Sequence, residues 1–233
     1  MSEIQKNLAG IQQRIRRACE AAGRSQEDVT LIAVSKTKPV SAIREVMQEG
    51  ICDFGENRPQ ELRDKYEQLP PGLSWHMIGH LQRNKIKYII DKVCMIHSVD
   101  TVELAEDISA QAVKRGLVIP VLLEVNMAGE ESKFGLRPEE TEAFARTVSV
   151  LPGIHVRGLM TIAPYVEDPE ENRVYFRRMK ELSIDIARKN IDNVDMIDLS
   201  MGMTGDFETA IEEGATFVRV GTGIFGERDY SGR

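Results

Sequence analysis

Signals for strands and helices alternate along this chain, and the alternation limits the folds it can adopt. Eight short apolar segments have the length of buried strands, and helical patterns separate them. They are residues 29–35, 52–55, 75–79, 94–99, 118–126, 155–160, 196–200 and 217–220. Apolar strands separated by helices are typical of a parallel sheet covered by helices. Eight such strands predict a closed (β/α)8 TIM barrel in one domain over residues 1–233; an open doubly wound sheet is the alternative.

The helical segments add one element to this pattern. Ile4, Leu8, Ile11 and Ile15 recur at three- and four-residue steps, which predicts an N-terminal helix over about residues 2–22 before the first strand. The other helices are expected over residues 41–49, 58–68, 83–90, 101–115, 138–150, 168–190 and 205–213.

Composition excludes several kinds of partner. Lys and Arg total 30 against 37 Asp and Glu, a formal net charge of −7, so nucleic acid is not expected as a main partner. No apolar run approaches the roughly 18 residues that span a bilayer, and the amino terminus lacks the apolar segment of a signal peptide. We therefore expect no membrane association and a cytoplasmic location. Cys19, Cys52 and Cys94 are far apart, so neither a disulfide framework nor a metal site is expected.

Lys36 stands at the end of the first expected strand, on the same face as Ile32 and Val34. Pro39 follows and ends the strand. A lysine at the edge of a sheet can be partly desolvated, which lowers its pKa and leaves a neutral amine that attacks aldehydes. A solvated lysine without such a role is the simpler interpretation of this segment alone, so the other strand ends must decide.

Glycines and hydroxyl groups gather after the last two expected strands, in residues 200–205 and 219–223. Loops at these positions of a barrel commonly bind phosphate, because glycines let backbone N–H groups approach its oxygens. Tight turns alone would also explain the glycines. The predicted phosphate ligands are Ser200, Gly202, Gly221 and Thr222.

Arg219 shares a face with Phe217 and Gly221, so it is expected to point into the mouth of the barrel below these loops. A buried guanidinium stays charged and needs an acceptor. One acceptor would be the ring nitrogen of a phosphate-bearing aldehyde. The other is a carboxylate in an internal salt bridge, Glu124 or Asp198, and the pattern does not separate the two.

Two other motifs carry less weight. Residues 221–226 match the G-x-G-x-x-G pattern of dinucleotide-binding folds, but the helix, the further strand and the acidic residue about 20 positions on that this pattern requires do not fit in residues 227–233. His76 and His80 have metal-like spacing, but the turn from strand to loop would not direct both at one ion. His97 and His155 are expected to be core or lining residues.

Seven segments together carry a resemblance to a known family. They are AVSKTKP (residues 33–39), FGEN (54–57), WHMIGHLQRNK (75–85), KFG (133–135), GLM (158–160), SMGM (200–203) and RVGT (219–222). With these segments the whole chain resembles the pyridoxal phosphate homeostasis protein family, whose members are alanine-racemase-like barrels that bind pyridoxal 5'-phosphate.

The resemblance implies a role for each matching residue. These residues are Lys36 (Schiff base), Asn57 and His80 (ring), Arg219 (pyridine nitrogen), and Ser200, Gly202, Gly221 and Thr222 (phosphate). Two positions depart from the family pattern: Thr204 stands where many members have serine, and Gly223 where many have alanine.

The family has no established catalytic activity and is linked to the cellular supply of vitamin B6. The resemblance therefore implies a monomeric, non-catalytic protein that keeps pyridoxal phosphate and passes it to apo-enzymes that depend on it. An arginine at the pyridine nitrogen would weaken the electron sink that catalysis needs. A low-activity amino-acid racemase or lyase is the alternative. The roles of Lys38, Lys85 and Lys133 are left open.

Overall fold

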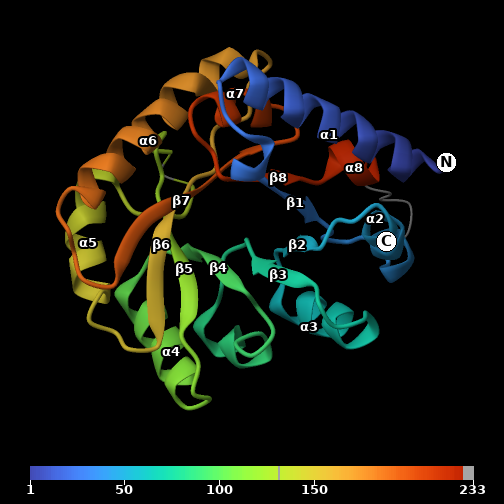
Figure 1. Ribbon diagram of the computed structural model, residues 1–233. Coiled ribbons are helices and arrows are strands. Elements are labelled where there is room, and N and C mark those ends of the chain that lie inside the picture. The colour runs from blue at the N-terminus through green and yellow to red at the C-terminus, as the bar shows by residue number, and fades with distance from the viewer. Residues whose placement is uncertain (131, 228–233) are drawn as a thin grey trace.

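The computed structural model describes residues 1–130 and 132–227; residues 131 and 228–233 of the expected domain lie outside this part. Within it the strands form a closed barrel in the order β1 to β8, each parallel to its neighbours (Figure 1). The strands are β1 (Thr30–Val34), β2 (Asp53–Glu56), β3 (Ser74–Met77), β4 (Met95–Val99), β5 (Ile119–Glu124), β6 (Ile154–Met160), β7 (Val194–Met203) and β8 (Phe217–Val220). The predicted barrel is confirmed, and the doubly wound alternative is wrong.

Helices surround the barrel (Figure 1). The α-helices are α1 (Glu3–Ala21), α2 (Val40–Gln48), α3 (Pro59–Gln68), α4 (Val102–Val113), α5 (Thr141–Val148), α6 (Arg173–Ala187), α7 (Phe207–Glu212) and α8 (Thr222–Phe225). The 3-10 helices are η1 (Gln26–Asp28), η2 (Arg83–Tyr88), η3 (Pro138–Glu140) and η4 (Pro169–Asn172). None of these helices combines the length and hydrophobicity of a membrane span.

Helix α1 covers the outside of the barrel where the last strands meet the first. Its start is fixed by a capping box, in which the Ser2 hydroxyl accepts from the Gln5 N–H and the Gln5 side chain accepts from the Ser2 N–H. Leu8, Ile11 and Ile15 are buried, as their spacing predicts, and α1 packs against α2, α7 and α8. The N-terminal helix is therefore part of the core.

Several elements differ from their expected limits. Within residues 83–90, Arg83–Tyr88 form the 3-10 helix η2 rather than an α-helix, because Gln82 provides no side-chain cap and such short connections favour tighter turns. Strand β7 continues to Met203, which pairs with Arg219, so residues 200–203 lie in the sheet and not in the loop after it. The four-residue helix α8 was not expected, since so short a segment has no periodic pattern.

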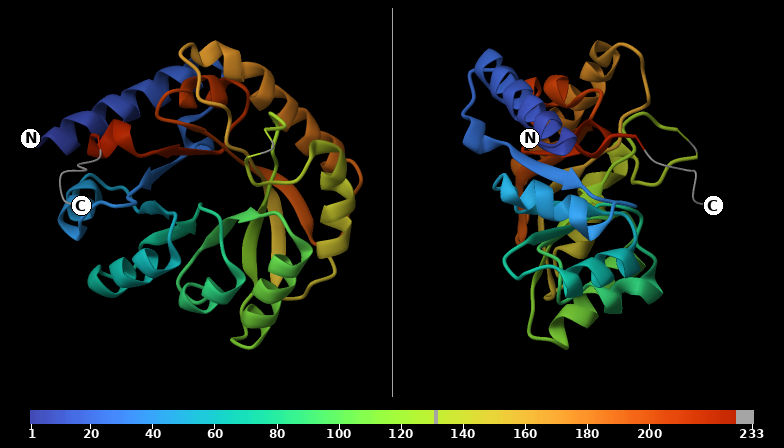
Figure 2. Two further views of the ribbon diagram at one scale, coloured as in Figure 1. Left: turned by 180° about the vertical axis from the view of Figure 1, so that it is seen from behind. Right: turned by 90° about the vertical axis from the view of Figure 1, so that its right-hand side faces the viewer.

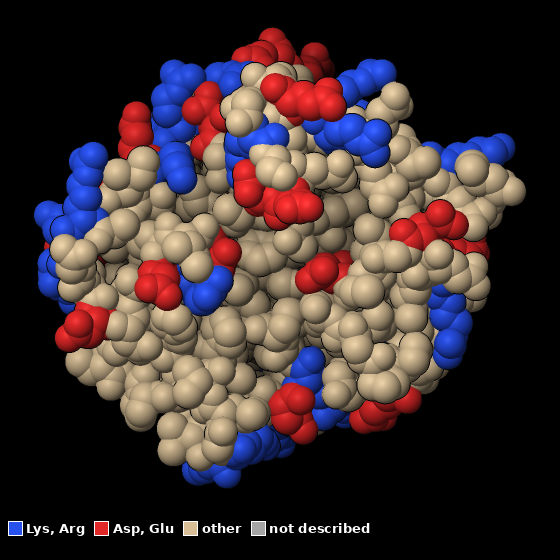
Figure 3. All heavy atoms as spheres, viewed as in Figure 1, with Lys and Arg blue, Asp and Glu red and all other residues tan. Residues whose placement is uncertain are grey.

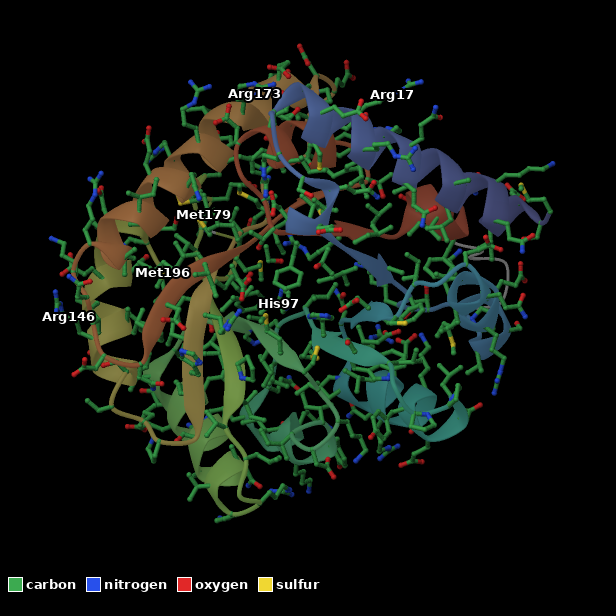
Figure 4. All side chains as sticks on the ribbon, in the orientation of Figure 1. Arg17, His97, Arg146, Arg173, Met179 and Met196 are labelled. Carbon is green, nitrogen blue, oxygen red and sulfur yellow. The ribbon has the colours of Figure 1, made fainter. Side chains whose placement is uncertain are left out.

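The inside of the barrel is unusually polar. Barrel interiors are dominated by branched aliphatic side chains. Here Met95, Leu122 and Met160 form a small apolar cluster with Phe217, and two buried histidines lie beside it. Figure 4 shows one of them, His97, near the centre of the barrel. The interior therefore contains groups whose hydrogen bonds must be satisfied without water.

Gly158 allows β6 and β7 to approach closely, because a Cβ atom at this position would lie 1.8 Å from the carbonyl oxygen of Asp198. We expect Gly158→Ala to prevent barrel closure and abolish folding. Gly10 in α1 is the matched control, since no atom lies within 4 Å of a Cβ built there. Gly10→Ala should stabilise the protein by about 0.5–1 kcal/mol through helix propensity. Urea unfolding followed by circular dichroism measures both; equal stability of the two variants would contradict this packing.

Candidate functional site

A cavity of about 710 Å³ opens at the end of the barrel where the strands finish. Figure 2 (left) looks onto this end, and its right view shows the connections after β5 and β6 projecting from it. Five of the eight predicted site residues line the cavity: Lys36, Asn57, Arg219, Gly221 and Thr222. Residues from both ends of the sequence therefore meet in one space, as parallel strands in a closed barrel require.

Lys36 follows β1 in a tight turn, which is closed by a hydrogen bond of 3.0 Å from the Lys38 N–H to the Ser35 carbonyl. Thr37 adopts a φ of 65°, a conformation that β-branched residues rarely take. It is held there because its N–H donates to the Glu61 carboxylate at 2.6 Å. The turn thus fixes the backbone from which the Lys36 side chain reaches the cavity.

Lys65 of α3 supports the same turn from outside the barrel. Its Nζ lies 2.7 Å from each of three oxygens, on Ser35 (carbonyl), Glu56 and Glu61. The Ser35 hydroxyl donates to the same Glu56 oxygen at 2.7 Å. Burial raises the pKa of Glu56, and the Lys65 ammonium opposes that rise. A buried ion pair therefore ties β2, α3 and the Lys36 turn together.

Arg219 points into the barrel below the cavity, as its position in β8 predicts, and is only 5% exposed. Its Nη1 donates to the Ser200 hydroxyl at 2.7 Å and its Nη2 to the Thr161 carbonyl at 2.8 Å. Burial lowers the pKa of Arg219 to about 10, which leaves it a cation at neutral pH. Neutral groups thus orient a buried charge.

The internal salt bridge considered for Arg219 does not form. Asp198 instead accepts from Arg157 Nε at 2.9 Å. Burial and the neighbouring Asp100 raise the pKa of Glu124 to about 7, with Arg219 acting in the opposite direction. Over residues 1–130 and 132–227, no carboxylate lies within ion-pair distance of Arg219. The guanidinium is therefore available to an acceptor in the cavity.

The loops after β7 and β8 meet at two threonines. The Thr204 and Thr222 hydroxyl oxygens are 3.2 Å apart, and the Gly223 N–H donates to the Thr204 hydroxyl at 3.3 Å. Thr204, Gly221 and Thr222 all line the cavity. The first N–H groups of α8 have no acceptor within the helix. Hydroxyl and N–H donors from both loops therefore form one cup, which we call the hydroxyl cup (Thr204, Gly221 and Thr222).

Thr204 lines the cavity but was not among the predicted phosphate ligands, whereas the predicted ligands Ser200 and Gly202 do not line it. Ser200 is fully buried inside the barrel, and a Cβ on Gly202 would lie 2.6 Å from the Cβ of Ala210 in α7. The expectation that these two residues follow the strand is wrong, because β7 ends at Met203. The hydroxyl at Thr204, just after Met203, was the available signal.

His80 is the third predicted residue that does not line the cavity. It is exposed and stacks on Phe134, with ring centroids 3.8 Å apart and an interplanar angle of 13°. The neighbouring Lys133 does line the cavity and pairs with Glu130 at 2.6 Å. His80 therefore contacts the loop that carries Lys133 rather than the cavity itself.

Asn57 lines the cavity with a buried amide whose oxygen Oδ1 has no hydrogen-bond partner in the described part of the chain. It can come this close to β3 because Gly79 has no side chain; a Cβ there would lie 2.7 Å from the Asn57 Cα. An unsatisfied buried acceptor is costly, so Asn57 suits a ligand that donates a hydrogen bond to its amide oxygen.

Lys38 has a structural role. Its Nζ donates to the carbonyls of Phe225, Gly226 and Glu227 at 3.0, 3.2 and 3.0 Å. These groups lie at the end of α8, where carbonyls lack helical partners and a cation is favourable. Lys38 thus connects the Lys36 turn to the helix that begins at the hydroxyl cup.

We expect Lys65→Met to destabilise the protein by about 3–5 kcal/mol, because it leaves the Glu56 carboxylate buried without its cation. Lys65→Met combined with Glu56→Gln should recover much of that loss, since the fully buried carboxylate is then replaced by a neutral amide and only the partly exposed Glu61 loses its cation. Urea-unfolding midpoints of the two variants and the wild type provide the test. Equal midpoints for the wild type and Lys65→Met would show that the ion pair does not support this turn.

Comparisons with known proteins agree with the fold and with the resemblance. A family model described as "Alanine racemase, N-terminal domain" matches residues 7–229. The "Pyridoxal phosphate homeostasis protein" of Aquifex aeolicus is 48% identical over 226 residues, covering 97% of this chain and 98% of that protein. The protein of the same name from Pseudomonas aeruginosa is 43% identical over 231 residues, covering 99% of this chain and 98% of its own.

Solved structures give the same result. PipY of Synechococcus elongatus, determined with PLP bound, superposes with a TM-score of 0.80 at 34% identity over 91% of this chain and 100% of that one. An alanine racemase of Clostridium difficile has a TM-score of 0.75 at 16% identity, which shows the shared fold alone; this chain matches 56% of its length. With relatives this similar over nearly its whole length, the chain belongs to the pyridoxal phosphate homeostasis protein family, within the proteins that share the alanine racemase N-terminal domain.

Proposed function

We propose that this protein binds pyridoxal 5'-phosphate covalently through Lys36 and acts in the homeostasis of that cofactor rather than in catalysis. The observation that carries the proposal is that an amine, a buried guanidinium and the hydroxyl cup line the same cavity. When bound, the cofactor supplies an aldehyde that condenses with an amine and a ring that withdraws electrons. Named relatives and the PLP-bound PipY structure support this choice of cofactor.

The residues around the phosphate and the ring nitrogen have distinct functions in this proposal. The hydroxyl cup binds the phosphate through the Thr204 and Thr222 hydroxyls and the backbone N–H groups near Gly221. Arg219 donates a hydrogen bond to the ring nitrogen. This nitrogen serves as its acceptor, since no carboxylate of the described residues pairs with Arg219. Ser200 acts indirectly by holding Arg219, and Gly202 by letting β7 pack on α7.

Arg219 also supports the absence of catalysis. A guanidinium with a pKa of about 10 stays protonated at neutral pH and keeps a neighbouring ring nitrogen unprotonated. A neutral ring is a weak electron sink, and racemisation needs a strong one. The alternative, a low-activity racemase or lyase, is supported only by the shared alanine racemase domain.

The position of the cavity suits transfer to other proteins. Tyr165, a lining residue, is 96% exposed, so the rim of the cavity faces solvent. An apo-enzyme that requires the cofactor can therefore approach the Lys36 amine directly. We propose such apo-enzymes as the recipients.

Covalent attachment has a direct test. After incubation with pyridoxal phosphate and reduction with borohydride, we expect the mass of one phosphopyridoxyl group on the peptide that contains Lys36, and its loss in Lys36→Ala. Lys38→Ala is the matched control, because this neighbouring lysine bonds to the end of α8. A label that persists in Lys36→Ala would overturn the assignment. Deuterium uptake at Cα of amino acids offered in heavy water would instead favour the racemase alternative.

The two departures from the family pattern contact each other. A Cβ on Gly223 would lie 3.0 Å from the Thr204 methyl carbon, so the extra methyl of Thr204 occupies the space that an alanine at 223 needs. We expect Gly223→Ala to destabilise this protein, and Thr204→Ser to cost about 1 kcal/mol through the lost methyl. The double variant should lose less free energy of unfolding than the two single variants lose together, by roughly 0.5–1 kcal/mol. Unfolding midpoints of the four proteins test this coupling, and simple additivity would contradict it.

A further inference from the structure

We propose that His97 and His76 are positioning residues for Arg219, acting through a buried relay of hydrogen bonds that crosses the barrel in one fixed proton order. The relay consists of Asp53, His76, His97, Ser200 and Arg219. Its link to the cofactor rests on the function proposed above; the proton order stands on the geometry alone.

Four consecutive contacts join the relay. Arg219 Nη1 lies 2.7 Å from Ser200 Oγ, and Ser200 Oγ lies 2.9 Å from His97 Nδ1. His97 Nε2 lies 2.9 Å from His76 Nδ1, and His76 Nε2 lies 3.1 Å from Asp53 Oδ1. Strands β8, β7, β4, β3 and β2 each contribute one member. The relay therefore runs from the floor of the cavity to the opposite end of the barrel.

Burial separates most of the relay from water. Ser200 and His97 are 0% exposed, and His76 is 3% exposed. At the far end the Asp53 side chain is 31% exposed, at the amino ends of the strands. Figure 3 shows that face, where side chains of both charges surround a hollow tan centre. Asp53 is thus the member that contacts solvent away from the cavity.

The two ends of the relay determine its proton order. A guanidinium can only donate hydrogen bonds, and an ionised carboxylate can only accept them. Between them, Ser200, His97 and His76 each hold one proton when the histidines are neutral. Only one arrangement forms all four bonds: each group donates toward Asp53 and accepts from the Arg219 side. Both imidazoles must then carry their proton on Nε2.

The surroundings of the histidines are compatible with this order. Burial, His76 and Arg219 lower the pKa of His97 well below its usual value, so His97 stays neutral. Burial and Asp53 raise the pKa of Cys94 to about 12; its thiol donates to the Trp75 carbonyl at 3.3 Å, while its sulfur lies 3.4 Å from His76 Nε2. Neither the lowered pKa of His97 nor the contacts of Cys94 change which groups of the relay donate a hydrogen bond and which accept one.

The order has a consequence at the cavity. The Ser200 O–H is committed to His97, so its oxygen lone pairs face Arg219 and fix one arm of the guanidinium. The Thr161 carbonyl fixes the other arm. Removing the acceptor on His97 frees the Ser200 hydroxyl to rotate, so the Arg219 N–H groups toward the cavity are then oriented by the Thr161 carbonyl alone.

Nitrogen NMR tests the proton order without the cofactor. The chain has four histidines, so ¹⁵N-labelled imidazoles give a small set of signals. We expect His76 and His97 as neutral Nε2–H tautomers in the cofactor-free protein, with assignments from His97→Phe and His76→Phe. A charged ring or an Nδ1–H tautomer at either position, at neutral pH, would overturn the relay.

Paired substitutions test the positioning of Arg219. His97→Phe keeps a ring of similar shape but removes the acceptor, whereas His97→Asn is smaller but retains an oxygen near the Nδ1 position. We expect the dissociation constant for pyridoxal phosphate to rise about tenfold in His97→Phe and less in His97→Asn, with the wild-type value in the control His155→Phe. A purely packing role predicts the reverse order of the two variants, and that result would overturn the proposal. A wild-type protein that binds no pyridoxal phosphate would refute the proposed function while the NMR result still decides the relay.

Discussion

A positive charge held inside the barrel, with no carboxylate partner among residues 1–130 and 132–227, is the constraint on which the site depends. Arg219 is oriented by a hydroxyl and a carbonyl, and these dipoles fix its direction without neutralising it. Burying a charge in this way is costly unless an acceptor arrives, so the cavity above Arg219 favours a ligand that presents a lone pair there. The Lys36 amine and the hydroxyl cup then determine which ligand can use it.

The residues that stabilise the fold around the cavity are mostly different from the residues that line it. On the outer side of β1 and β2, the Lys65 ion pair holds the turn that carries Lys36, so the backbone of this turn is anchored from outside the cavity. On the inner side, buried polar side chains lie beside a small apolar cluster, where aliphatic layers usually fill a barrel. The result is a site whose supporting residues lie mostly outside the cavity.

Sequence reasoning predicted the barrel and the inward direction of Lys36 and Arg219, and the reasons are physical. Strand and helix periods determine topology, and the two-residue period of a strand was enough to direct Lys36 and Arg219 inward. Sequence reasoning could not find the end of β7, because a glycine such as Gly202 usually indicates a turn. In the structure this glycine instead lies in the strand and allows close contact with α7. Sequence reasoning also could not pair His76 with His97, whose contact depends on the register between two strands.

Lys38 has a wider consequence for how the barrel can open. Its ammonium group bridges the exit of the first strand and the end of the last described helix, so three hydrogen bonds join two parts of the chain that are remote in sequence. A displacement of α8 away from the barrel would pull on the segment next to Lys36. If pyridoxal phosphate binds as proposed, its release at the phosphate end and at the aldehyde end would then be a concerted event rather than two successive ones.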